Sequence, residues 1–347
     1  DYWPESPEAA LAAYLIGKTY KDIGEVKNSI KAFDKVREDY PDKHVSVLSL
    51  WEILDIAKVH KDEKLRIKVL KELTFDIKRT NANDYHLTRA SQELAGYYFY
   101  AGEGTKGLEA LQEQGSASRM RREGGVTGQA HGIGHRAVSH LHKNNKTVKA
   151  AEKLTDQLIS FLIGKIPEDL EKGKAKEQTK DLLSKVASLH AAVKRDKEVL
   201  DTYMRLGGLI GMTDEVLGKI ASWHKTKKRR KEARQTYEKF SNKVNGLANI
   251  ATMYAEDKDP DGAKNIYGQI IQLDKENEPK WASSSAKVYR ECKKAEQAVQ
   301  IYDYVASIDP DNKGKWLTES ASTWQEAGEH EKAVESWRGV IPATGDA

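Results

Sequence analysis

One pattern occurs three times, 35 residues apart: ATMYAEDKDPDGAKNIYGQI (251–270), AKVYRECKKAEQAVQIYDYV (286–305) and ASTWQEAGEHEKAVESWRGV (321–340). In each copy a small residue precedes an aromatic residue by three positions, and a second small residue follows that aromatic after nine. Another aromatic comes four residues later, one helical turn further along the same face. Because small residues let helices approach closely, each copy predicts two antiparallel helices that stack on the next pair.

The pattern also occurs near the N-terminus and, less regularly, in the middle of the chain. Ile16-Gly17 and Tyr20 are followed by Gly24, Ser29, Phe33, Val36 and Pro41 in the same frame. Weaker copies contain Ala57, Ala95 with Tyr98, Ala187 with His190, and Ala221 with His224. We expect about nine units in one elongated array over residues 1–347, clear near 10–43, 244–278, 279–312 and 314–347 and degenerate over 44–243. A helical bundle would not repeat glycine and proline in register at this period.

These columns resemble the tetratricopeptide repeat family, whose motif has the same small, aromatic and turn-glycine positions and a closing proline. The resemblance implies an all-α, right-handed superhelical solenoid of antiparallel helix pairs that binds a peptide or partner domain in its concave groove. The N-terminal unit, with Pro7–Ala10, Tyr14–Gly17 and Asp39–Pro41, is similar to repeats of the bacterial barrel-assembly lipoprotein and the Tol–Pal coordinator. That similarity favours a periplasmic or cell-envelope location over the cytoplasm.

Composition agrees with a thin structure in which each element buries one face. The chain is 39% hydrophobic and 32% charged, and its net charge of +4 is too small to imply nucleic acid. The single cysteine, Cys292, excludes an internal disulfide. The sequence predicts no membrane span. The chain begins at Asp1-Tyr2-Trp3-Pro4 and its last unit stops near Pro342, so we expect a fragment of a longer array or ends that a partner covers.

First-helix residues that point away from the packing columns are the candidate binding surface. These are Tyr14, Lys18, Lys21, Asn245, Asn249, Lys280, Lys287, Arg290 and Gln325. The set is polar and net positive, which favours an acidic or carboxylate-bearing peptide as the ligand. No cofactor is expected.

Two basic clusters support an alternative function, binding to nucleic acid or an anionic surface. One spans 119–122 and contains Arg119, Arg121 and Arg122; the other, KTKKRRKEAR, spans 225–234. Aromatic residues are not interleaved with these bases, so a stacking platform is unsupported. Solvated turns between helices are the ordinary explanation of such runs, and nucleic acid is the weaker prediction.

The histidines of QAHGIGHRAVSHLH (129–142) are weak candidates for a metal site. His131, His135 and His142 share one stripe of a helix, and histidines four residues apart can chelate zinc. No carboxylate accompanies them at a chelating spacing, and Gly132 and Gly134 weaken the helix. We therefore expect groove-lining polar residues and no metal. Catalytic motifs are absent from the sequence, and the protein is not predicted to be an enzyme.

Overall fold

The computed structural model describes the backbone of residues 7–343, and these residues contain no β-strand. The chain forms two compact units, residues up to 202 and residues from 203 onward. Helix α11 (Asp196–Ile210) crosses the division between them. None of the helices between residues 7 and 343 has the length and apolar character needed to cross a membrane.

The helices of the first unit are α1 (Pro7–Asp22), α2 (Val26–Asp39), α3 (His44–Val59), α4 (Glu63–Lys71), the π-helix η1 (Glu72–Asp76), α5 (Asp84–Tyr100), α6 (Gly104–Glu113), α7 (Ser118–Arg122), α8 (Gly125–His142), α9 (Val148–Ile163) and α10 (Ala175–Ala192). Those of the second are α12 (Asp214–Thr226), α13 (Arg230–Tyr237), α14 (Lys243–Glu256), α15 (Pro260–Leu273), η2 (Lys275–Asn277), α16 (Glu278–Glu291), α17 (Ala295–Ile308), η3 (Pro310–Asn312), α18 (Lys313–Glu326) and α19 (His330–Ala343).

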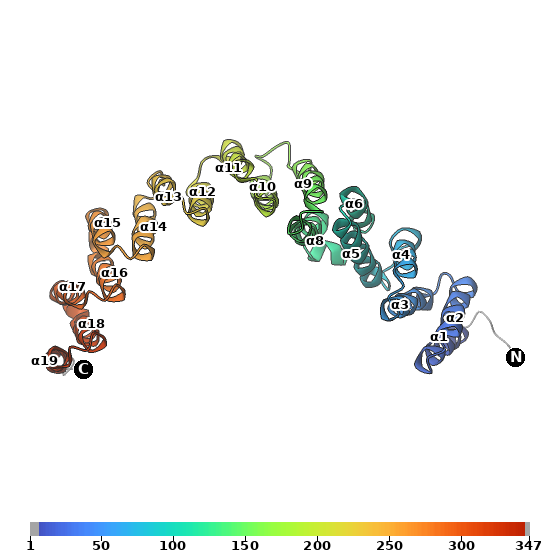
Figure 1. Cartoon of the computed structure of the whole chain (residues 1–347), viewed down its shortest axis with the longest axis horizontal. Helices are drawn as coiled ribbons and strands as arrows, with labels where there is room; N and C mark the ends of the chain where they lie inside the picture. The colour runs from blue at the N-terminus through green and yellow to red at the C-terminus, as the bar shows by residue number, and fades with distance from the viewer. Residues whose placement is uncertain (1–6, 344–347) are drawn as a thin grey trace. The chain divides into compact units, whose positions relative to one another are not determined.

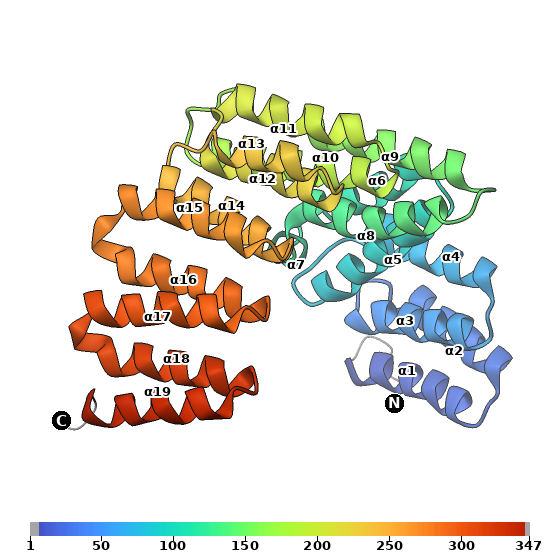
Figure 2. The same ribbon diagram turned by 60° about the vertical axis from the view of Figure 1, so that its left-hand side comes forward.

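Each unit is a stack of antiparallel helix pairs, which confirms the predicted all-α solenoid (Figure 1). A first helix packs on the second helix of its own pair, as in α1 with α2 and α16 with α17. That second helix then packs on the next first helix, as α15 does on α16 and α17 on α18 (Figure 2). The core therefore runs through each unit as a series of layers between neighbouring helices.

The small residues that recur at the same position of each repeat allow the helices to approach closely, as the sequence predicts. Ala251, Ala286 and Ala321 on the first helices are fully buried. In the N-terminal pair, a Cβ added to Gly17 would lie 2.6 Å from the Phe33 ring of α2. Only glycine leaves room for that aromatic ring at this distance, so the small–aromatic pairing fixes how tightly α1 and α2 pack.

The turn between the helices of a pair has a left-handed residue seven positions after the first small residue. Gly24 and Gly328 hold this place as expected, with φ of 78° and 81°. Lysine holds it at five turns: Lys61, Lys194, Lys228, Lys258 and Lys293, with φ between 54° and 62°. The next residue closes the turn, because its N–H donates to the carbonyl oxygen of the aromatic column, as from Asp259 to Tyr254 at 3.0 Å.

The middle of the chain departs from the period because its connections differ. Lys61 follows Leu54 by seven residues, so Leu54 holds the small position of that pair and Ala57 the aromatic one. The second helix of this pair closes through η1, and the short helix α7 lies between α6 and α8. These features lengthen the spacing between first helices and explain why the sequence pattern is weak over 44–243.

Candidate functional site

The candidate site lies on the first-helix face of the second unit, which is the exposed side of α14, α16 and α18 that carries Asn249, Ser284 and Glu319. A groove of about 670 Å³ runs between α16 and α18 on this face. It is lined by Ser283, Ser284, Lys287, Arg290, Glu291, Lys293, Tyr302, Lys315, Trp316, Glu319 and Glu326. Helix periodicity produces this lining, because positions three or four residues apart on α16 face the same way as their counterparts on α18.

Arg290 forms the floor of the groove by joining its two walls. Its Nη1 donates to Glu319 Oε2 at 2.6 Å, and its Nε donates to Glu326 Oε2 at 2.8 Å. The hydrogen bond with Glu326 raises the pKa of Arg290 further above its ordinary value, and the same bond lowers the pKa of Glu326. The guanidinium is therefore neutralised within the protein and acts mainly as a brace between α16 and α18.

Lys287 differs from Arg290 because it points into solvent at the groove edge. Its side chain is 72% exposed, and its Nζ lies 3.9 Å from Glu291 Oε1. Two hydroxyls lie nearby: Ser283 and Ser284 both donate to the backbone carbonyl oxygen of Lys280. The groove thus combines exposed cations, hydroxyls that can also accept, and the indole of Trp316 on the opposite wall.

The other candidates of the second unit lie outside this groove. Asn249 Nδ2 donates to the Asn245 carbonyl oxygen at 2.8 Å on α14, so this pair is partly satisfied within its own helix. The Lys280 ammonium lies 4.5 Å from the centre of the Trp281 ring. Gln325 is exposed on α18. The candidates of the second unit are therefore spread over three helices, and only Lys287 and Arg290 of them line a common groove.

The three N-terminal candidates, Tyr14, Lys18 and Lys21, interact with carboxylates of α3 and are not free to bind a ligand. The Tyr14 hydroxyl donates to Glu52 Oε1 at 2.9 Å, and Lys21 Nζ donates to Glu52 Oε2 at 2.6 Å and to Asp55. Lys18 Nζ lies 3.6 Å from Glu52. Burial raises the pKa of Glu52, but the hydrogen bonds from Lys21 and Tyr14 outweigh burial, and the net shift is downward.

The sequence analysis missed this pairing, although charged residues that recur at equivalent positions of the repeats indicate it. The cation stands four residues after the first small position in Lys21, Lys58, Lys225 and Arg290. Its carboxylate partner lies on the next first helix of the same unit: Glu52, Glu93, Glu256 and Glu319, respectively. Comparing neighbouring repeats would have predicted three of these ion pairs, because Glu52, Glu93 and Glu319 stand two residues before the small position, whereas Glu256 stands five residues after it. They remove much of the positive charge on which the expectation of an acidic ligand depended.

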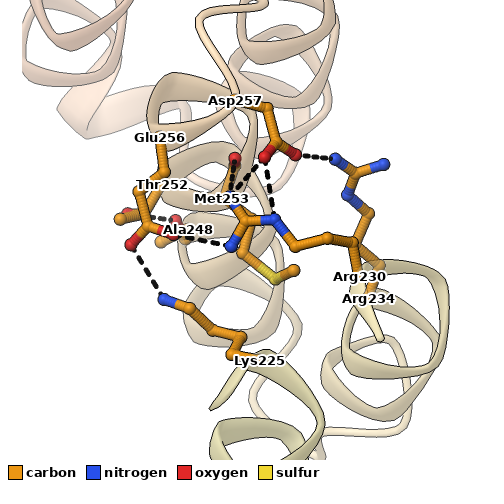
Figure 3. A network of polar contacts seen from close by, with 8 residues as sticks. All are labelled: Lys225, Arg230, Arg234, Ala248, Thr252, Met253, Glu256 and Asp257. Atoms are coloured by element: carbon orange, nitrogen blue, oxygen red, sulfur yellow. Dashed lines mark hydrogen bonds and ion pairs between the residues drawn. The ribbon is translucent and has the colours of Figure 1, made fainter. Parts of the chain in front are cut away.

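The basic run at 225–234 forms a similar network between three helices (Figure 3). Lys225 Nζ and Arg230 Nη1 reach Glu256 at 2.8 and 2.9 Å. Arg230 Nε donates to Asp257 Oδ1 at 2.8 Å, and Arg234 Nη2 donates to Asp257 Oδ2 at 2.5 Å. Exposed carboxylates at the end of α14 thus pair with three of the basic residues of this run, Lys225, Arg230 and Arg234.

Aromatic rings do lie against these bases, although they are not interleaved with them in sequence. The Arg234 guanidinium is 3.9 Å from the centre of the Tyr254 ring, and Lys227 Nζ is 4.6 Å from the centre of the Trp223 ring. In the first unit Arg119 pairs with Glu123 at 2.7 Å and stacks 4.6 Å from the Tyr85 ring centre. Both clusters therefore contain structural cation–π contacts.

The histidine stripe joins two helices and brings no metal ligands together. His131 Nε2 lies 2.7 Å from Ser188 Oγ on α10, and the His131 and His135 ring centres are 5.6 Å apart. No group of three His, Cys, Asp or Glu side chains within the described part of the chain could hold a metal ion. Burial, with the charges of His135 and Lys185, lowers the pKa of His131 to about 4, so this ring is neutral at neutral pH.

Comparison with known proteins gives one family and many similar solved structures. Residues 11–43 match the model of the tetratricopeptide repeat family. No curated protein matches the chain. Among solved structures, the chain is similar to the tetratricopeptide domain of P58(IPK), with 12% identity and a TM-score of 0.26 over 97% of this chain and 94% of that one. It is also similar to yeast Tom70, with 10% identity and a TM-score of 0.30 over 99% and 90%.

Stacked antiparallel pairs with recurring small and aromatic columns define a helical repeat protein. The match over 11–43 falls on α1 and α2, and the later pairs keep its small positions and its left-handed turn residue. The pair α1 and α2 is therefore a tetratricopeptide repeat, and the chain is a helical repeat protein built of similar pairs. Folds of this class are generally scaffolds for protein–protein interaction and are generally not enzymes.

Proposed function

We propose that the groove between α16 and α18 binds an extended segment of a partner protein. The supporting observation is the groove itself, about 670 Å³ in volume, with an indole on one wall and hydroxyls on the other. Binding grooves of this size combine apolar surface with a few polar groups that orient the ligand. The Arg290 brace holds the walls in place before binding, which reduces the ordering that the ligand must drive.

The ligand that fits best has mixed polarity, with a carboxylate placed opposite Lys287. The groove lining contains four cations (Lys287, Arg290, Lys293 and Lys315) and three carboxylates (Glu291, Glu319 and Glu326). Glu319 and Glu326 neutralise Arg290, so the exposed Lys287 is the cation best placed to attract an acidic group. The indole of Trp316 offers the ligand only a narrow apolar edge, because it is 8% exposed and the Lys315 ammonium lies 4.3 Å from the centre of its ring.

Phage display of random 12-residue peptides on the whole chain tests this proposal. Peptides selected on the wild type should bind Lys287→Glu at least tenfold more weakly, because the variant replaces an attraction with a repulsion. Ser284→Trp should also abolish binding by filling the groove. Fluorescence anisotropy with the selected peptides measures both effects.

Lys264→Glu on α15 is the matched control, because it makes the same charge change at an exposed second-helix position. It should leave peptide binding within twofold. Equal losses for Lys264→Glu and Lys287→Glu would indicate a nonspecific charge effect. Loss on altering Lys264 alone would place the binding surface on the second helices and refute the groove proposal.

Binding of nucleic acid is not proposed, because Lys225, Arg230, Arg234 and Arg119 are engaged by carboxylates. A cell-envelope location, an array that is continuous over both units, and the absence of catalysis remain predictions from the sequence.

A further inference from the structure

A pocket of about 500 Å³ lies in the first unit, where the second helix α4 packs on the first helix α5. It is lined by Arg66 of α4, by Glu93, Gly96, Tyr97 and Tyr100 of α5, and by Ala101, which follows that helix. Tyr97 is 41% exposed and Tyr100 is 45% exposed. The pocket is separate from the groove between α16 and α18, which belongs to the other unit.

Both tyrosines stand where other repeats carry a different kind of residue. Tyr97 stands two residues after the first small residue of its pair, and the equivalent residues Ile56, Met253 and Val288 are at most 5% exposed. Tyr100 stands five residues after that small residue, where α14, α16 and α18 all carry an exposed glutamate. The repeat pattern therefore accounts for neither exposed ring.

Contacts with neighbouring side chains hold both rings in place. Tyr100 meets the His140 ring of α8 edge-on, with the ring centres 5.4 Å apart. Tyr97 meets the buried Tyr98 ring in the same way, with the ring centres 5.6 Å apart. Because the rings are fixed before a ligand arrives, little side-chain entropy is lost when it binds.

Gly96 leaves open the space that a side chain would take from the pocket. A Cβ added there would meet a single neighbouring side chain, Ile133, at 3.6 Å, which is an ordinary van der Waals contact. The packing of α5 therefore does not require glycine, although glycine inside a helix is less stable than alanine. A longer side chain at this position would extend into the pocket, so the glycine keeps the pocket accessible.

The charged groups beside the pocket are neutralised within the protein. Lys58 Nζ donates to Glu93 Oε1 at 2.9 Å, and Arg66 Nη1 donates to Glu63 Oε1 at 3.2 Å. The other terminal nitrogen of Arg66, Nη2, lies 4.0 Å from Glu93 Oε2, which is beyond hydrogen-bond distance, so it can still donate. These two cations and two carboxylates balance, and they give an acidic or a basic ligand no net attraction.

The groups left for a ligand are aromatic faces and hydrogen-bond donors. No described residue is hydrogen-bonded to the hydroxyl of Tyr97 or Tyr100, and the Arg66 guanidinium can only donate. A proline-rich segment fits this set, because each proline offers an apolar ring and a carbonyl acceptor but has no N–H that needs an acceptor. Such segments adopt the polyproline II conformation, in which no carbonyl group is used in an internal hydrogen bond.

We propose that this pocket binds a proline-rich segment of a partner protein in the polyproline II conformation. Proline rings pack against Tyr97 and Tyr100, while the tyrosine hydroxyls and Arg66 donate to carbonyl oxygens of the segment. The segment already has its extended conformation before it binds, which limits the entropy lost. This proposal is independent of the one made for the groove between α16 and α18.

The probe is a nonaproline peptide titrated into the whole chain in an isothermal calorimeter. We expect saturable binding that weakens at least fivefold in Tyr97→Ala and in Tyr100→Ala, because each variant loses a packing face and a donor. Gly96→Leu should abolish binding by filling the pocket. Tyr100→Phe keeps the ring and should weaken binding only about threefold, the effect of one hydrogen bond.

Tyr85→Ala is the matched control, because Tyr85 is 50% exposed on the same helix but lies outside the pocket. It should change binding less than twofold. Lys287→Glu should leave nonaproline binding unchanged, and Tyr100→Ala should leave binding in the groove between α16 and α18 unchanged, so the two proposals fail separately. Circular dichroism checks that each variant is folded.

Three results would overturn the proposal. The first is the absence of saturable binding up to millimolar nonaproline, or binding that Tyr97→Ala and Tyr100→Ala leave unchanged. The second is equal binding of a glycine–serine peptide of the same length, which would mean that the polyproline II conformation is not recognised. The third is tighter binding of an oligolysine peptide that Tyr100→Ala abolishes, which would assign the rings to a cationic ligand.

Discussion

Lysine at a left-handed turn position is the residue-scale feature with the clearest energetic consequence. Lys258 has φ of 56°, where an L-residue with a Cβ costs about 1–2 kcal/mol. Lys258→Gly should therefore stabilise the folded protein by about 0.5–1 kcal/mol, after the greater chain entropy of glycine in the unfolded state is deducted. Urea unfolding measures the change. Lys264→Gly, in the middle of α15, should instead destabilise by about 1 kcal/mol.

His131 gives a second prediction at this scale, concerning pH. Its folded pKa of about 4 lies below the unfolded value of 6.5, so the unfolded state binds more protons between these pH values. Stability must therefore fall as pH drops from 6.5 toward 4. In His131→Gln the loss of stability on acidification should be smaller than in the wild type by about 1 kcal/mol. This is less than the full pKa shift of His131 would give, because the side chain is only partly buried. Urea unfolding at pH 7.5 and pH 5 tests this, and an unchanged pH dependence would contradict it.

Contacts between helices were predictable from the sequence where small and aromatic residues pack, but not where long charged side chains form ion pairs. The small and aromatic columns at Gly17, Phe33, Ala251 and Ala298 were predictable, because backbone proximity restricts residue type locally. The partners of Arg230 and the second partner of Arg290, Glu326, were not, because a long side chain can reach several carboxylates on the next helix. Helix α7 was also missed, because five residues of mixed polarity carry no periodic signal.

The network around Arg230 supports an element-scale prediction. Arg230→Gln removes the hydrogen bonds to Glu256 and Asp257 that tie α13 to α14, so it should destabilise the second unit by about 1 kcal/mol, the upper range for partly exposed pairs. The exposed neighbour Arg229→Gln should cost much less. The difference between the two variants in urea unfolding should shrink at 0.5 M NaCl, because salt screens exposed pairs. Equal costs for both variants would mean that the ion pairs contribute little.

At the scale of the whole molecule, stacked pairs make stability a sum of local and nearest-neighbour interactions. Ala298 on α17 is fully buried in one hydrophobic cluster of the second unit, together with Ala286 and Tyr302. Ala298→Leu should overpack that cluster and cost about 1–3 kcal/mol, whereas Gln300→Leu on the exposed side of the same helix should change stability little.

Hydrogen exchange followed by mass spectrometry shows how far the effect of Ala298→Leu extends. Amides of α16, α17 and α18 should lose protection by the full cost, because these helices contact the overpacked site directly. Amides of α1 to α6 should keep the protection they have in the wild type, since these helices belong to the other compact unit. A uniform loss over every helix would instead mean that the chain unfolds as one cooperative body, and stability could then no longer be treated as a sum over neighbouring pairs.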